Sequence, residues 1–402
     1  MSIDRADLPA VTVNTPYTQT VAMAASGGTP PYLYACTVSG GTGLSAGVTP
    51  AGPTDGGVSC VISGTPLAAG ELTINFSVTD GTGASADAGF LSINVSTSAD
   101  PLANWHWRNP LPEEMQNLVA VTYGNGTFVI ISNSLSGDTW MIRSSTDGVT
   151  WTERATGTNR RLSGITYGND TFVAVGEAGT ILTSTEGVTW TSRYSGTINS
   201  LSGVTHGNGI FVAVGQAGTI LTSIDGITWN ATTAGYSFSS PTHGNGAFVA
   251  VGPSPIGAGF SIFTSNDDGL TWARTFTQEA CIGPIGCAWI FIRGVTYGNG
   301  ILLALPDWGP FLTSADGQTW TIVHHIPDSA GTSYLHAVAY GDGAFVGVGK
   351  EGRIVTADAD DVTTWTTRAS GTSIDLNGVT YGNGTFVAVG DNGAIIQSDP
   401  LE

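Results

Sequence analysis

Apolar residues alternate with polar ones through residues 8–96. Leu72, Ile74, Phe76 and Val78 occupy every second position, as the inward face of a half-buried strand requires. Clusters rich in Gly, Pro, Ser and Thr separate such runs and are typical of tight turns. No segment of the chain shows sustained helical periodicity. The pattern predicts an all-β chain that begins with a β-sandwich over residues 8–96.

A tetrapeptide, YGNG or a close variant, recurs after residue 100. Its copies begin at Tyr123, Tyr167, His206, His243, Tyr297, Tyr340 and Tyr381. The spacing is about 40 residues, the length of a four-stranded propeller blade. In the copy SGITYGNDTFVAVGEAGTILTSTEGVTW, strand-like runs are separated by Gly-containing turns. Each copy predicts a four-stranded antiparallel unit that buries both of its faces only by stacking on its neighbours.

The last repeat ends before its fourth strand. It stops at AIIQSDP, whereas the segment NWHWRNP precedes the first repeat and matches the missing piece. Trp105 and Arg108 take the places that Trp190 and Arg193 hold in a complete repeat. We therefore expect a seven-bladed β-propeller whose N-terminal strand closes the last blade and leaves no free edge. The expected boundaries are 8–96 for the sandwich, 97–103 for a linker and 104–400 for the propeller.

The composition narrows the classes of function. Charged residues make up 11% of the chain, its formal net charge is −19, and Lys350 is its single lysine. A surface this acidic repels phosphate backbones, which argues against nucleic-acid binding. No apolar run approaches the roughly 18 residues that a transmembrane helix needs. We expect no cofactor, although an acidic surface can attract calcium.

Four cysteines fall into two local pairs, Cys36 with Cys60 and Cys281 with Cys287. Neither pair has the CxxC or Cys/His spacing of a zinc or thioredoxin site. Two disulfides are the simpler interpretation, with free thiols as the alternative. Because disulfides belong to oxidising compartments, we expect a secreted or cell-surface protein. No signal peptide is visible, so we expect a mature fragment whose export signal has been removed.

The first segment also carries motifs of a known kind. The stretches GGTPPYLYACTVSGG, CVISGTPLAAG and FSVTDGTGASA resemble the signature of bacterial immunoglobulin-like modules. The resemblance covers nearly the whole of residues 8–96. Such modules are usually spacers or stalks at the cell surface, and the resemblance implies no catalysis.

The repeats resemble those of another large group. SNDDGLTW, from Ser265 to Trp272, resembles the full Asp-box of the sialidase-type propellers, and the other copies are one residue shorter. The segment is most similar to bacterial YGNGxFVAVG…ILTSxDGxxW repeat proteins within the broad BNR/Asp-box superfamily. Sialidases carry three arginines, an Arg-Ile-Pro motif, a Tyr/Glu pair and usually six blades. This chain departs from that pattern, so the resemblance does not imply a sialidase.

Residues that fill the same position in successive repeats are expected to serve the fold. Acidic residues recur in the turn between strands three and four, where a carboxylate caps a tight turn through backbone hydrogen bonds. They are Asp147, Glu186, Asp225, Asp268 and Asp316. Most tryptophans also fill one repeat position. Trp107, Trp140, Trp289 and Trp308 do not, and therefore need another explanation.

Three of these tryptophans are expected on one face of the propeller. Trp140 and Trp308 are placed in loops between strands two and three, and Trp289 in a connection between blades, and both kinds of loop share a face. Polar departures from the repeat fall there too, around blades five to seven. The candidate ligand-binding residues are Trp308, Asp307, Arg293, His336, Tyr334, Trp289, Trp140, Lys350 and Asp391. A concave propeller mouth is a common ligand site, although loop residues also vary freely without a function.

These side chains favour a non-enzymatic extracellular binding protein. Exposed tryptophan rings stack on sugar faces, and Arg, Asp and His bind hydroxyls or carboxylates. We therefore expect carbohydrate as the ligand, or an extracellular protein as the partner.

Two alternatives stay open. A glycan-active enzyme could hydrolyse with Asp307 and Asp391, or act as a polysaccharide lyase with His336 or Tyr334 as base and Arg293 on a uronate. An assembly or adhesion scaffold would need no pocket chemistry. The propeller also resembles photosystem II assembly-factor propellers, whose arginine patch this chain does not show.

Overall fold

The protein, seen in a computed structural model, forms two compact units, Met1–Asp100 and Pro101–Glu402. The structure describes residues 2–3, 11–12, 17–24, 29–39, 43–49, 58–67, 70–96, 100–108, 116–134, 140–254, 259–279, 291–306, 310–323 and 334–401. In these residues the helical segments are 3₁₀ turns of three residues, and the remaining elements are strands. None of the described helices has the length and apolar character needed to cross a bilayer. The predicted all-β class is confirmed.

In the first unit, the residues that the structure describes form two four-stranded sheets. One has the order β1 (Ser2–Ile3), β3 (Tyr17–Ala24), β6 (Val58–Gly64) and β5 (Leu44–Thr49). The other has the order β2 (Val11–Thr12), β8 (Ser85–Ser96), β7 (Gly70–Thr79) and β4 (Leu33–Ser39). Ile62, Ile74 and Phe76 are fully or almost fully buried in one core that both sheets share. The alternation read from the sequence is therefore the alternation of buried and exposed strand positions.

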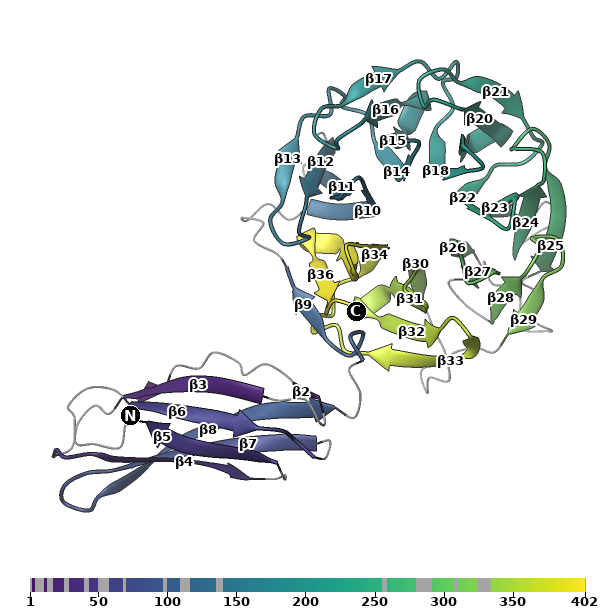
Figure 1. Cartoon of the computed structure of the whole chain (residues 1–402). Coiled ribbons are helices and arrows are strands. Elements are labelled where there is room, and N and C mark those ends of the chain that lie inside the picture. The colour runs from purple at the N-terminus through teal and green to yellow at the C-terminus, as the bar shows by residue number, and fades with distance from the viewer. Residues whose placement is uncertain are drawn as a thin grey trace. The chain divides into compact units, whose positions relative to one another are not determined.

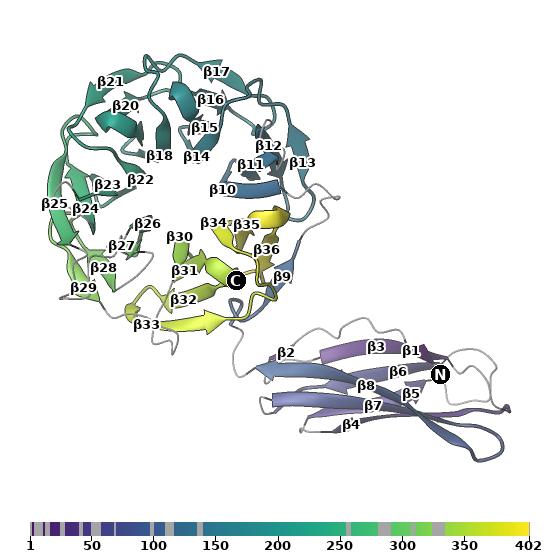
Figure 2. The same ribbon diagram turned by 180° about the vertical axis from the view of Figure 1, so that it is seen from behind.

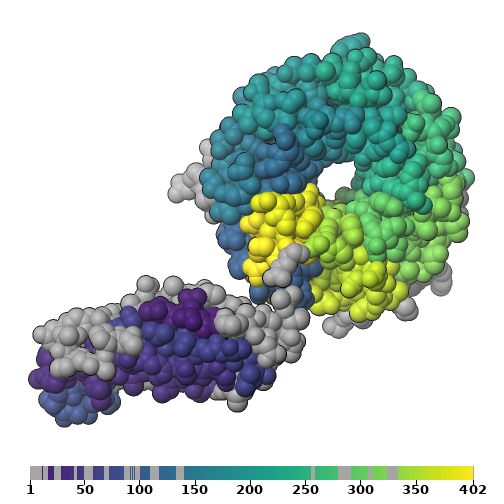
Figure 3. Space-filling model, in the orientation of Figure 1, coloured from purple at the N-terminus to yellow at the C-terminus, as the bar shows by residue number. Residues whose placement is uncertain are grey.

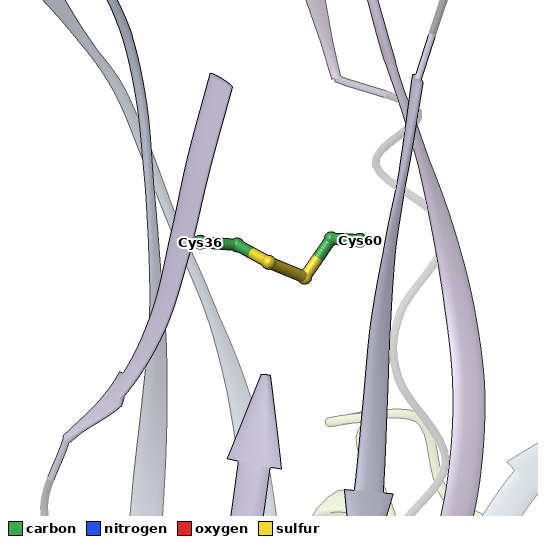
Figure 4. The surroundings of a disulfide bond; sticks show 2 residues. All are labelled: Cys36 and Cys60. Carbon is green, nitrogen blue, oxygen red and sulfur yellow. A yellow bond between two sulfur atoms is a disulfide. The ribbon is translucent and has the colours of Figure 1, made fainter. Parts of the chain in front are cut away.

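A disulfide links the two sheets. Cys36 of β4 and Cys60 of β6 are buried and bonded to each other (Figure 4). This confirms the first of the two predicted bridges. Cys281 and Cys287 lie outside the described residues, so their bridge remains a prediction.

The described residues of the second unit form seven four-stranded antiparallel sheets. Figures 1 and 2 show them arranged in a circle, and Figure 3 shows an opening at its centre. From the innermost strand outwards, sheets one to four are β10 (Gln116–Gly124), β11 (Thr127–Ser134), β12 (Trp140–Ser145) and β13 (Thr152–Arg154); β14 (Leu162–Gly168), β15 (Thr171–Gly176), β16 (Ile181–Ser184) and β17 (Thr191–Arg193); β18 (Leu201–Gly207), β19 (Ile210–Gly215), β20 (Thr219–Ser223) and β21 (Asn230–Thr233); β22 (Ser239–Gly244), β23 (Ala247–Pro253), β24 (Gly259–Ser265) and β25 (Ala273–Glu279). Sheets five to seven are β26 (Ile292–Gly298), β27 (Ile301–Pro306), β28 (Phe311–Ser314) and β29 (Thr321–Val323); β30 (Leu335–Gly341), β31 (Ala344–Gly349), β32 (Ile354–Asp358) and β33 (Asp361–Arg368); β34 (Leu376–Gly382), β35 (Thr385–Gly390), β36 (Ile395–Ser398) and β9 (Trp105–Trp107).

The aromatic residue of each YGNG copy packs its sheet on the preceding one. Its ring lies over the glycine that follows the corresponding aromatic residue there. A Cβ atom on Gly124 would stand 2.0 Å from the ring of Tyr167, and one on Gly382 would stand 2.1 Å from the ring of Tyr123. The second contact joins the seventh sheet to the first. Glycine is required at these positions, because any side chain would displace the neighbouring ring.

Histidine replaces the tyrosine of this contact in sheets three and four. The rings of His206 and His243 each pack 4.7 Å from a buried phenylalanine of their own sheet, measured between ring centroids. Their Nε2 atoms are buried and have no hydrogen-bond partner among the described residues. Burial lowers the pKa of both imidazoles; His243 lowers the pKa of His206 further, whereas Asp268 partly opposes the shift at His243. Burial therefore favours the neutral form of both rings.

The strand β9 is the outermost strand of the seventh sheet. It pairs antiparallel with β36, with Trp105 opposite Ser398 and Trp107 opposite Ile396. The Nε atom of Arg108 donates a 3.0 Å hydrogen bond to the side chain of Gln397. The chain that enters the second unit thus pairs with the strand that ends it.

Candidate functional site

One face of the circle carries the connections between strands two and three and those between sheets. We call it the loop face, and the opposite one, with the YGNG and acidic turns, the turn face. Four of the connections between strands two and three are 3₁₀ turns: η1 (Glu177–Gly179), η2 (Gln216–Gly218), η4 (Lys350–Gly352) and η5 (Asp391–Gly393). The second residue of each turn is left-handed; Glu351, for example, has φ 57°. The first residue of each turn, which includes the candidates Lys350 and Asp391, therefore lies at an equivalent position.

A β-bulge recurs near the start of the innermost strands. In sheets five to seven it falls at Arg293, His336 and Asn377. Two of these side chains reach the main chain of the next sheet: Nδ1 of His336 lies 3.1 Å from the carbonyl oxygen of Leu376, and Nδ2 of Asn377 donates over 3.1 Å to that of Leu118. The bulge residues thus join neighbouring sheets, which gives His336 a structural partner.

The structure brings two of the predicted residues, Lys350 and Tyr334, into contact on the loop face, and gives two others contacts with residues that were not predicted. The amine of Lys350 lies 5.1 Å from the ring centroid of Tyr334, whose residue surface is 39% exposed. The guanidinium of Arg293 lies 5.7 Å from the ring centroid of Phe291. Asp391 accepts a 2.7 Å hydrogen bond from the amide of Asn377 and therefore belongs to the framework of the seventh sheet.

The expectation of an exposed ring at Trp140 is wrong. Trp140 is the first residue of β12 rather than part of a loop, and 9% of its surface is exposed. It packs with Ile131 and Leu162, and the guanidinium of Arg161 lies 5.8 Å from its ring centroid. The pairing of β11 with β12 extends to Asn133, opposite Trp140, and this longer ladder places the indole in the core. Three other candidates, Asp307, Trp308 and Trp289, lie outside the described residues.

The acidic turn of sheet four differs from the prediction. Asp267, not Asp268, accepts hydrogen bonds from the Ser265 hydroxyl and from the backbone N–H of Thr271. The Thr271 hydroxyl, which also donates to this carboxylate, is the largest cause that lowers the pKa of Asp267. Asp268 is the inserted residue of this longer turn, and it accepts instead from the side chain of Asn208. The turn carboxylates serve the fold and are not candidates for catalysis.

A groove of about 550 Å³ opens on the loop face at sheet six. It is lined by residues 350–353 and 367–373, which belong to η4, the end of β33 and the connection to sheet seven. Three cations line it: Lys350, Arg353 and Arg368. Lys350 is one of the candidates predicted from the sequence, whereas Arg353 and Arg368 are not. A comparison of the fourth position of each turn, where Arg353 stands in place of Thr180 or Thr219, would have found Arg353.

Among the residues that the structure describes, no group of three or more His, Cys, Asp or Glu side chains could hold a metal ion. The groove offers three cations, the carboxylate of Glu351, hydroxyls and backbone groups instead. Such groups bind and orient an oxygen-rich ligand, and they do not form a pair of opposed carboxylates.

Comparisons with known proteins identify the class. Residues 102–235 match the family model described as the DUF6242 beta propeller domain. No curated protein matches the chain. Its fold is similar to that of the structure "YCF48 bound to D1 peptide", with a TM-score of 0.56 and 14% identity over 76% of this chain and 98% of that one. YCF48 from Cyanidioschyzon merolae gives 0.53 and 19% over 74% and 98%. The WD40 beta propeller domain of Doa1 gives 0.54 and 12% over 74% and 97%. The chain therefore contains a β-propeller, as the repeats predict.

Proposed function

We propose that this chain is a non-enzymatic extracellular binding protein, with an immunoglobulin-like sandwich followed by a seven-bladed propeller of the Asp-box type. Its ligand is a carbohydrate, bound on the loop face at sheet six. The disulfide between Cys36 and Cys60 supports an extracellular location, because such bonds persist in oxidising compartments. The match to a propeller family model supports a binding role, since propellers present a large rigid face with variable loops.

The observation that carries the proposal is an exposed aromatic ring beside a polar groove. The backbone N–H of Lys350 donates to the carbonyl oxygen of Tyr334, and its amine packs on the Tyr334 ring. Lys350 also lines the groove, together with Thr367 and Ser373. Aromatic rings stack on the apolar faces of sugars, and hydroxyl and charged groups bind the sugar hydroxyls. The groove and Tyr334 together supply both kinds of contact.

A glycan array tests the proposal. The purified protein is applied with and without calcium, alongside Tyr334→Ala and the control Tyr194→Ala. Tyr194 is 87% exposed and follows β17 in the connection to sheet three, away from the groove. We expect selective glycan binding that falls about fivefold in Tyr334→Ala, since loss of one stacked ring costs on the order of 1 kcal/mol, and that stays unchanged in Tyr194→Ala. A blank array, or equal loss in both variants, contradicts the proposal.

A second candidate function is protein docking on the turn face. Val149, Val188, Ile227 and Leu270 occupy the same position of four successive acidic turns, and each is 39–60% exposed. Exposed apolar side chains in one region mark protein contact surfaces. The structure titled "YCF48 bound to D1 peptide" shares the fold, which fits this candidate. If Leu270→Asp loses binding to a protein partner but keeps glycan binding, protein docking on the turn face is supported. If partner binding is unaffected by that change, this candidate is excluded.

A further inference from the structure

We propose that the groove of sheet six selects a sugar that carries an anionic group, a carboxylate or a sulfate ester. The inference rests on the carbohydrate function proposed above and names the class of ligand. The chain has 12 lysines and arginines in 402 residues. Three of them, Lys350, Arg353 and Arg368, line this one groove.

Comparison of the repeats separates the cations that serve the fold from those that do not. Arg368 has counterparts in Arg154 and Arg193. Each of these three arginines donates from Nε to a Ser or Thr hydroxyl on the third strand of its own sheet, at 2.8 Å. Arg368 therefore belongs to the repeat and is held in place by it.

Lys350 and Arg353 have no such counterparts. The first and fourth positions of the turn hold Glu177 and Thr180 in sheet two, Gln216 and Thr219 in sheet three, and Asp391 and Ala394 in sheet seven. All four turns form the same 3₁₀ structure, so the fold does not require a cation at either position. Lys350 of η4 and Arg353, which follows η4, thus distinguish sheet six from the other three sheets that have this turn.

The turn that carries these cations is held rigidly. The N–H of Arg353 donates 3.1 Å to the carbonyl oxygen of Lys350, and the N–H of Glu351 donates 2.8 Å to the carboxylate of Asp375 in the next connection. A Cβ on Gly352 would stand 2.1 Å from the carbonyl oxygen of Thr372, so the turn packs directly on the loop that forms the other wall. A rigid site loses little conformational entropy when a ligand binds.

The local charge favours an anion despite the net charge of −19. At physiological ionic strength charges are screened over about 8 Å, so an incoming group responds mainly to the residues around the groove. Among the described residues, two carboxylates lie beside the three cations: Glu351 lines the groove 3.9 Å from the amine of Lys350 on an exposed surface, and Asp375 accepts from the backbone N–H of Glu351. The exposed pair of Lys350 and Glu351 contributes little. The guanidinium fork matches the geometry of a carboxylate or a sulfate oxygen pair.

The test compares charged and neutral forms of the same sugar. The probes are oligogalacturonate and its full methyl ester, and a sulfated galactan oligosaccharide and its desulfated form, measured by calorimetry with EDTA present to exclude calcium bridges. The variants take residues from other repeats: Lys350→Gln, as at Gln216, and Arg353→Thr, as at Thr180. The control Arg160→Ala removes an exposed cation of the loop face outside the groove. Unchanged melting temperatures show that the variants are folded.

We expect the native protein to bind one charged probe at least tenfold more tightly than its neutral form. Each groove variant should lose about tenfold in affinity for the charged probe, which corresponds to the loss of one charge-assisted hydrogen bond. Its affinity for the neutral probe should not change. Arg160→Ala should bind both probes as tightly as the native protein does. Which charged probe binds identifies the anionic group. Equal binding of charged and neutral forms overturns this inference and leaves the carbohydrate function standing. Absence of binding to every sugar, here and on the array, overturns both.

Discussion

The side chain of Gln397 links three parts of the second unit and gives a quantitative test of how the circle of sheets closes. It is 7% exposed. Its Oε1 accepts from Arg108 at 3.0 Å, and its Nε2 donates to the Thr385 hydroxyl at 3.0 Å and to the carbonyl oxygen of Asp147 at 3.4 Å. These contacts join Arg108, which follows β9, to β36 and β35 of the same sheet and to the acidic turn of the first sheet. Replacement by alanine removes all three at once.

The expected loss follows from those bonds. A hydrogen bond to a charged group contributes about 1.5–3 kcal/mol and a neutral one about 1 kcal/mol, while the longest contact contributes less. We therefore expect Gln397→Ala to lower the free energy of unfolding by about 3 kcal/mol. In Gln397→Thr the new hydroxyl stands at the position from which Thr183 and Thr356 accept a hydrogen bond from the arginine of their own sheet. This variant should lose about half as much free energy of unfolding, because the contact with Asp147 is still lost.

Urea denaturation followed by tryptophan fluorescence measures these losses. All 11 tryptophans lie between Trp105 and Trp365, so the signal reports on the second unit. The control is Gln318→Ala, because Gln318 is exposed on an acidic turn and its replacement should change stability by less than about 0.5 kcal/mol. A loss at Gln397→Ala no larger than that of the control would refute the idea that this side chain ties the closing strand to its neighbours.

Three further predictions concern the framework. His206→Tyr and His243→Tyr restore the usual residue of the repeat and should flatten the pH dependence of stability. Burial lowers the pKa of both imidazoles below the unfolded value of 6.5, so the unfolded state takes up protons that the folded state does not. The free energy of unfolding of the native protein therefore falls as the pH drops below about 6.5. Denaturation curves between pH 5 and pH 8 check this, and an equal decline in native protein and variants contradicts it. Asp267→Ala should destabilise the protein by about 1–2 kcal/mol and Asp268→Ala by less; thermal melts that rank them in the opposite order would show that the turn is assigned wrongly. Replacing both disulfide cysteines of the first unit by alanine should cost that unit about 3–4 kcal/mol, given their separation of 24 residues, as measured by far-ultraviolet circular dichroism; a change below about 1 kcal/mol would contradict the estimate.

The architecture of the second unit could be predicted because its signals are local. Each YGNG turn needs a left-handed residue, and Asn125, Asn208 and Asn245 take this role with φ between 47° and 50°. The glycine before the asparagine admits the aromatic ring of the next sheet. Both requirements recur with the repeat, so the repeat alone defined the strands and their order.

The side chains of the loop face were harder to predict, because their surroundings come from distant parts of the chain. His336 stood out as a polar departure from the repeat, yet its ring contacts the main chain of the next sheet at a bulge that no motif marks. Trp140 was placed in a loop because the repeat gave no sign that β11 and β12 are longer in the first sheet. Arg353 was not predicted, because it differs from the repeat at the position after the turn rather than at the first position of the turn.

Hydrogen–deuterium exchange with a bound sugar tests the central claim most directly. The protein is compared free and saturated with the oligosaccharide that binds it most tightly on the array. We predict that slower exchange will concentrate in residues 350–353 and 367–373, the two walls of the groove. Protection confined to the turn face, for instance to the acidic turns around Asp147 and Asp225, would contradict the assignment of the binding site to the loop face.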